Sequence, residues 1–126
     1  PAVSSYLDVY KLGGSVVDYL EHGIRGVCNV LGFTPKIIRS SELGISRHLS
    51  GEQKILEIVS RCGANTYVNL PGGLTYYSRK NFKMRGIDLK ILKPYQGNSW
   101  SILHRLHEDS IKEIYSEIKN NENFYS

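Results

Sequence analysis

The stretch from Asn69 to Tyr77 has the residue types best suited to holding a small polar ligand. It follows a predicted strand over residues 66–70 and includes the pair Gly72 and Gly73. Paired glycines let a backbone adopt positive φ and approach a ligand closely. Ligands of open α/β sheets bind outside the carboxyl ends of the strands. Backbone N–H groups here could hold a phosphate or a carboxylate, although a tight strand-to-helix turn accounts for the same residues.

Two other predicted strands also end in polar or aromatic side chains. Glu42 follows the predicted strand over residues 36–40, and its carboxylate is the one plausible catalytic base. Aromatic rings and an amide follow the predicted strand over residues 87–92. We expect the three strand ends to share one cleft of the kind that binds sugars or nucleotides. Its expected substrate-binding residues are Asn69, Gly72, Gly73, Tyr77, Tyr95, Gln96 and Trp100.

Histidines and cysteines give no sign of a metal or a nucleophile. His104 and His107 share a helix face, but no acidic or cysteine side chain lies beside them at ligand spacing. The sequence therefore predicts no metal site and no cofactor. Cys28 and Cys62 each fall inside an apolar helical pattern, so we expect reduced, core-packed thiols and a cytoplasmic protein.

Composition limits the class of protein. The chain has 126 residues, with 16 Lys and Arg against 12 Asp and Glu, giving a formal net charge of +4. That length fits one domain, and no apolar run approaches the ~20 residues that would insert into a membrane. Binding to nucleic acid usually requires a denser basic face. The basic residues that do cluster, around the single acidic Asp88, are Arg79, Lys80, Lys83, Arg85, Lys90 and Lys93.

Apolar periodicity and turn residues predict the elements that position these groups. Gly13 and Gly14 break the first helical pattern, and Gly32 ends the second. Ser50 followed by Gln53 predicts a capping box at the start of the next helix. The predicted helices cover about residues 4–12, 15–31, 51–62, 79–85 and 101–119, and the predicted strands 36–40, 66–70 and 87–92.

This alternation of helices and strands predicts an α/β fold. We expect a single domain over residues 1–126, in three layers, with a mostly parallel sheet of about three strands flanked by about four helices. Residues 120–126 are expected to form a flexible tail.

Three segments together resemble the WbqC-like family, whose members occur in bacterial polysaccharide and O-antigen gene clusters. The order and spacing of the shared residues match over about residues 20–107. The residues that carry the resemblance lie in segments 30–43, 54–77 and 82–103, and include Ser40-Ser41-Glu42-Leu43, Pro71-Gly72-Gly73 and Pro94-Tyr95-Gln96.

The resemblance implies a transferase-like protein that binds or modifies a sugar or nucleotide-sugar. Two departures bear on this: the family's N-terminal signature is absent, so we expect a shortened or partial family member, and His104 stands where the family usually has Asp. Two other functions stay open. One is a non-catalytic α/β interaction module that forms a homo-oligomer, and the other is a nucleic-acid-binding protein that uses the Arg79–Lys93 cluster.

Overall fold

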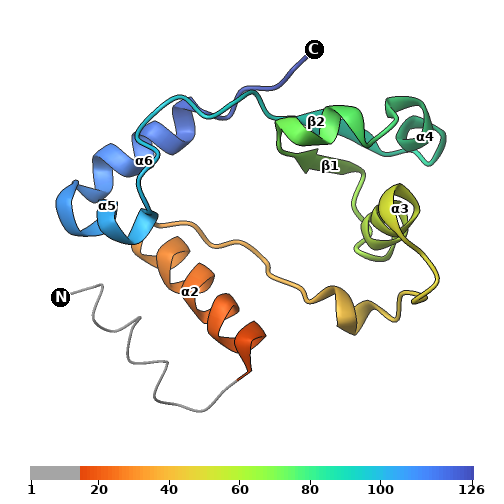
Figure 1. The fold of residues 1–126 in the computed structure, drawn as a ribbon, viewed down its shortest axis with the longest axis horizontal. Helices are drawn as coiled ribbons and strands as arrows, with labels where there is room; N and C mark the ends of the chain where they lie inside the picture. The colour runs from red at the N-terminus through yellow and green to blue at the C-terminus, as the bar shows by residue number, and fades with distance from the viewer. Residues whose placement is uncertain (1–14) are drawn as a thin grey trace. The chain divides into compact units, whose positions relative to one another are not determined.

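The computed structural model describes residues 15–126, which divide into two compact units (Figure 1). An α/β unit contains residues 37–95 and 121–126, and a helical unit contains residues 15–36 and 96–120. The helix expected near residues 4–12 lies outside the described residues. A single domain over residues 1–126 stays a prediction.

The α/β unit is built on two parallel strands. Strand β1 (Thr66–Asn69) pairs with β2 (Asp88–Ile91), and the register joins Thr66 to Asp88 and Asn69 to Ile91. Parallel neighbours need a crossover connection. It consists here of the 3₁₀ helix η3 (Pro71–Thr75) and the helix α4 (Arg79–Met84). The α/β class and the strands expected at residues 66–70 and 87–92 are confirmed.

The third expected strand, over residues 36–40, is wrong. The backbone there forms no strand and leads into a 3₁₀ turn, η2 (Ser40–Leu43). Successive side chains of a strand point to opposite faces, so the neighbours Ile37 and Ile38 cannot build one apolar face. Ile38 is 39% exposed, and no run of buried side chains draws this segment onto the sheet.

Helix α3 (Gly51–Arg61) starts after Ser50 as expected, but the expected capping box is wrong because the Ser50 side chain accepts no capping hydrogen bond. Gly51 has a φ of +51°, so the chain enters the helix through a left-handed residue. Cys62 follows the last turn of α3 and is exposed, which corrects its expected core position. Cys28 is half-buried.

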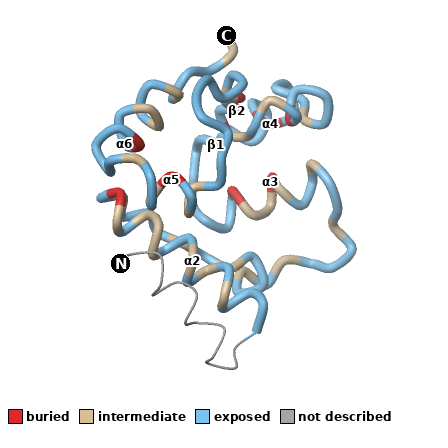
Figure 2. Tube along the Cα trace, turned by 60° about the vertical axis from the view of Figure 1, so that its left-hand side comes forward, coloured by how far each residue is buried: buried red, intermediate tan, exposed pale blue. Residues whose placement is uncertain are grey.

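The core of the α/β unit surrounds one aromatic ring. Phe82 of α4 is fully buried, and it stacks on Tyr67 of β1 with 5.6 Å between ring centroids. Tyr77 meets both rings edge-on at 5.9 Å. Buried positions on α3, α4 and β2 are red in Figure 2. The cluster they form is Leu56, Val59, Phe82, Ile87, Leu89 and Ile91.

Residues 121–126 lie along β2. Phe124 forms an antiparallel bridge with Leu92, and the Tyr125 N–H donates to the Ile91 carbonyl at 2.9 Å. The Lys93 N–H donates to the Asn123 carbonyl at 2.8 Å. The sequence predicted a flexible tail here, whereas these backbone hydrogen bonds attach the segment to the sheet.

The helical unit contains α2 (Val16–Val30), α5 (Ile102–Glu108) and α6 (Ile111–Asn120). A single helix over residues 101–119 is therefore wrong. The chain breaks because Ser110 caps α6: its hydroxyl accepts from the Glu113 N–H at 3.2 Å, while the Glu113 carboxylate accepts from the Ser110 N–H at 3.1 Å. Within residues 15–126, no helix has the length and apolar character needed to cross a membrane.

A buried arginine joins α5 to α6. Arg105 has only 5% of its surface exposed, and its guanidinium donates to Asp109 at 2.7 Å and to both carboxylate oxygens of Glu117 at 2.6 and 3.1 Å. The carboxylates of Asp109 and Glu117 hold the pKa of Arg105 above its ordinary value. A buried charge is tolerated only with such partners, so this ion pair fixes the angle between the two short helices.

We predict that Phe82→Ala destabilises the protein by about 3–5 kcal/mol, because it leaves a cavity among the buried residues of α3 and β2 and the ring of Tyr67. Met84→Ala is the matched control, since Met84 lies on the same helix and is 75% exposed. It should cost less than about 1 kcal/mol. Urea denaturation followed by circular dichroism measures both, and equal losses would contradict this description of the core.

Candidate functional site

The expected site residues fall in both units. Glu42, Asn69, Tyr77 and Tyr95 belong to the α/β unit together with the two glycines, whereas Gln96 and Trp100 belong to the helical unit. Gly73 lies directly beside two other residues expected to bind substrate, Asn69 and Tyr77, at the carboxyl end of β1.

Gly73 is buried, and its place in η3 leaves no room for a side chain. A Cβ at residue 73 would lie 2.7 Å from the amide nitrogen of Asn69 and 3.2 Å from Cδ2 of Tyr77. Neither Gly72 nor Gly73 has a positive φ, which corrects the conformational reason that the sequence suggested for the pair. Residue 73 must be glycine because a Cβ there would have no room, whereas a Cβ at residue 72 would meet nothing within 4 Å.

Asn69 and Tyr77 both help to hold the end of the sheet. The Asn69 side-chain oxygen accepts from the Leu70 N–H at 2.8 Å, and its carbonyl accepts from the Leu92 N–H at 2.9 Å. Tyr77 packs into the aromatic core, and burial together with the neighbouring Tyr77 raises the pKa of Tyr67 above its ordinary value. These contacts show that Asn69 and Tyr77 stabilise the fold at the place where both were expected to bind substrate.

The remaining expected residues lie at the surface. Glu42 is exposed in η2, which packs against α3. Tyr95 is 47% exposed and Trp100 is 63% exposed. The Trp100 ring meets the His104 ring edge-on, with 4.4 Å between centroids. His104 in the first turn of α5 therefore has an aromatic neighbour in the segment that precedes the helix.

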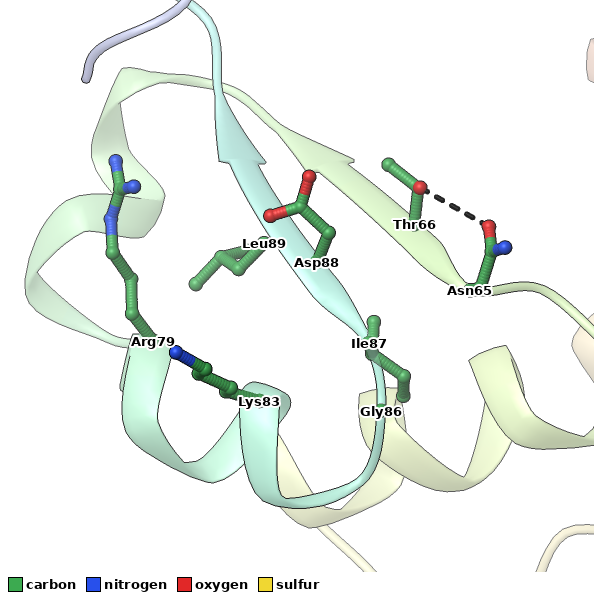
Figure 3. Close-up of a pocket in the computed structure, with 8 residues that line it drawn as sticks. All are labelled: Asn65, Thr66, Arg79, Lys83, Gly86, Ile87, Asp88 and Leu89. Carbon is green, nitrogen blue, oxygen red and sulfur yellow. Dashed lines mark hydrogen bonds between the residues drawn. The ribbon is translucent and has the colours of Figure 1, made fainter.

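A cavity lies elsewhere in the α/β unit, around the residues that begin both strands (Figure 3). Its volume is about 570 Å³. Side chains of α4 form one side and the first residues of β1 and β2 the other. The lining residues are Asn65, Thr66, Arg79, Lys83, Gly86, Ile87, Asp88 and Leu89.

Glu52 of α3 holds α4 in place beside this cavity. One carboxylate oxygen accepts from the Ser78 N–H at 2.5 Å, and the other accepts from the Asn81 amide at 2.5 Å. These hydrogen bonds, from the Ser78 backbone first and the Asn81 side chain second, lower the pKa of Glu52. The carboxylate thus joins two helices that are far apart in sequence and orients the helix that carries Arg79 and Lys83.

A comparison with family models shows which family the chain belongs to. The model of the WbqC-like protein family matches residues 4–117, which is most of the chain. The chain belongs to the WbqC-like protein family. The resemblance noted in the sequence is thereby confirmed. Searches of curated proteins and of solved structures found no match to this WbqC-like chain.

The described part of the WbqC-like chain has no cluster of side chains suited to binding a metal ion. Across residues 15–126, no three His, Cys, Asp or Glu side chains are grouped so as to hold a metal ion. His107 instead contacts the neighbouring Glu108 carboxylate at 2.8 Å.

Sequence reasoning missed the cavity and Glu52. The spacing of Arg79 and Lys83 by four residues on a predicted helix was a usable signal, because it places both cations on one face. No local pattern could have paired Glu52 with Ser78 and Asn81, since those contacts join residues 26 and 29 positions apart.

We predict that Gly73→Ala destabilises the protein by about 1–3 kcal/mol, because the new Cβ displaces Asn69 and Tyr77. Gly72→Ala should change stability by less than about 1 kcal/mol, since the space is open and the backbone is already compatible with alanine. Thermal denaturation of the two variants tests this. A Gly73→Ala protein as stable as Gly72→Ala would refute the space requirement.

A second prediction concerns Glu52. Because the native pKa is lowered, this carboxylate stabilises the fold above its ordinary pKa of about 4.3, and the contribution is lost as the pH falls through the lower native value. Glu52→Gln should therefore cost about 1 kcal/mol at pH 7, and the difference from wild type should shrink below about pH 4.

Denaturant titrations between pH 3 and pH 7 measure that difference. Glu57→Gln on the same helix is the control, because it removes only an exposed contact with Arg61 and should cost a few tenths of a kcal/mol. A Glu52→Gln penalty that does not change with pH would contradict the assignment.

Proposed function

We propose that this chain binds a sugar or nucleotide-sugar and serves as a transferase-like protein in the assembly of bacterial surface polysaccharide, such as O-antigen. The observation that carries this proposal is membership of the WbqC-like family over residues 4–117. Members occur in polysaccharide gene clusters, as the resemblance implied. A cytoplasmic location, where nucleotide-sugars are available, belongs to the same proposal.

The exposed side chains that the sequence singled out have suitable chemistry for such a ligand. Trp100 and Tyr95 present ring faces on which a sugar or base can stack. The Gln96 amide can hold hydroxyl groups, and the Glu42 carboxylate is the candidate base. Within the α/β unit, Asn69 and Tyr77 would act indirectly, by fixing the end of β1.

Trp100 is the only tryptophan in the chain, so its fluorescence reports directly on this part of the proposed site. We predict that a nucleotide-sugar changes that fluorescence in a saturable way below millimolar concentration. Trp100→Ala should weaken binding about tenfold in calorimetry, because a stacked ring contributes about 1–3 kcal/mol.

Tyr76→Ala is the matched control, since Tyr76 is 79% exposed and outside the proposed site. It should leave binding unchanged. A panel of nucleotide-sugars and free sugars that shows no binding at millimolar concentration would sink the proposed function.

One observation favours the non-catalytic alternative, an interaction module that forms a homo-oligomer. Helix α2 has no buried residue, and four of its apolar side chains are more than half exposed: Val16, Val17, Leu20 and Ile24. Exposed apolar patches of this kind mark association surfaces. Light scattering over a range of protein concentrations separates the two functions, because a monomer that binds nucleotide-sugars leaves no support for this alternative.

A further inference from the structure

We propose that the cavity beside α4 binds the phosphate group of a phosphorylated sugar or nucleotide-sugar, with Arg79 and Lys83 as the phosphate ligands. None of the residues assigned to the sugar under the proposed function lines this cavity, so the cavity is a separate site. The sugar part of its ligand rests on the proposed function, whereas the phosphate part rests on Arg79 and Lys83. A volume of about 570 Å³ suits a ligand of that size.

The first argument is charge. Arg79 and Lys83 are four residues apart on α4 and both line the cavity. In the described part of the chain neither forms an ion pair, whereas Arg25 and Arg61 each pair with a glutamate one turn earlier on their helices. Two like charges at this spacing destabilise a helix by a few tenths of a kcal/mol. An anion bound between them would remove that repulsion.

The second argument is the polarity of the opposite side. Asp88 and Thr66 are register partners at the start of the two strands, and Asn65 precedes Thr66. A carboxylate, a hydroxyl and an amide are hydrogen-bonding partners for sugar hydroxyls. The Asp88 carboxylate would repel a phosphate, so we place the phosphate beside Arg79 and Lys83 of α4 and not beside the first residues of the strands.

The third argument is preorganisation. The Arg79 guanidinium donates to the Tyr125 carbonyl at 3.2 Å, which uses one of its five N–H donors and restrains the group. Asp88 is fixed through its backbone, whose N–H donates to the Asn65 carbonyl at 2.8 Å. Gly86, with a φ of +71°, makes the tight turn that places β2 beside α4. A site whose ligands are already held loses less entropy on binding.

The test is calorimetric titration of the full chain with three probes: a sugar 1-phosphate, a nucleoside diphosphate and the unphosphorylated sugar. We expect Lys83→Gln to weaken both phosphorylated probes about tenfold and to leave the free sugar unaffected, because one charge-assisted hydrogen bond is lost. Arg79→Gln should act in the same direction. Thermal denaturation checks that each variant is folded, since Arg79 also contacts Tyr125.

Lys80→Gln is the matched control, because Lys80 is an exposed cation on the same helix that does not line the cavity. It should leave all three affinities unchanged. Phosphorylated probes that bind no better than the free sugar, or that are insensitive to both cavity substitutions, overturn the inference. If the phosphorylated probes bind through Arg79 and Lys83 but no sugar or nucleotide-sugar binds in a way that Trp100→Ala weakens, the cavity assignment stands and the proposed function fails.

A single-stranded oligonucleotide is the last arm of the experiment. Nucleic-acid binding through the Arg79–Lys93 cluster would draw on many phosphate contacts, and its affinity would fall steeply with salt. If the oligonucleotide binds more tightly than the nucleoside diphosphate, and Lys80→Gln weakens it as much as Lys83→Gln does, the cluster is a general basic surface. That result contradicts a discrete phosphate pocket.

Discussion

Burial of the Phe82 ring is the interaction on which the α/β unit depends. A two-stranded sheet is at best marginally stable by itself in water, and parallel pairing adds the entropy of a long connection. Phe82 offsets this because it comes from that connection and packs on the sheet, where Tyr67 stacks against it. The buried ring therefore fixes α4, and with it the side of the cavity that carries Arg79 and Lys83.

The parts of the fold that the sequence predicted well are those defined by local chemistry. Strand β2 alternates exposed and buried residues, and glycines at positions 32, 63 and 86 adopt the positive φ that ends a helix. The predictions that failed depended on contacts between residues distant in sequence, or on two local signals that compete for the same segment. Residues 36–40 have strand-forming side chains but no partner face, and Ser110 breaks an otherwise continuous helical pattern by capping α6.

The candidate site shows the same division. A glycine pair after a strand indicates close backbone approach, and the approach exists, but Gly73 accommodates Asn69 and Tyr77 of its own chain. A glycine leaves space for either a side chain of the same protein or a bound ligand. The sequence alone cannot tell which of the two occupies that space. Arg79 and Lys83 pose the reverse problem, since cations on a short helix are typical of a solvated surface until the tertiary structure places a cavity beside them.

Electrostatics on α4 connects folding to the proposed ligand. A short helix with two unpaired cations on one face and few internal hydrogen bonds has little intrinsic stability. It is held from outside, by the Glu52 carboxylate at its start and by the buried Phe82 on its inner face. Had Glu52 instead paired directly with Arg79 or Lys83, the helix would be stabilised and the cavity neutralised. The hydrogen bonds to Ser78 and Asn81 stabilise α4 without pairing Glu52 with either cation, so Arg79 and Lys83 stay available to an anion in the cavity.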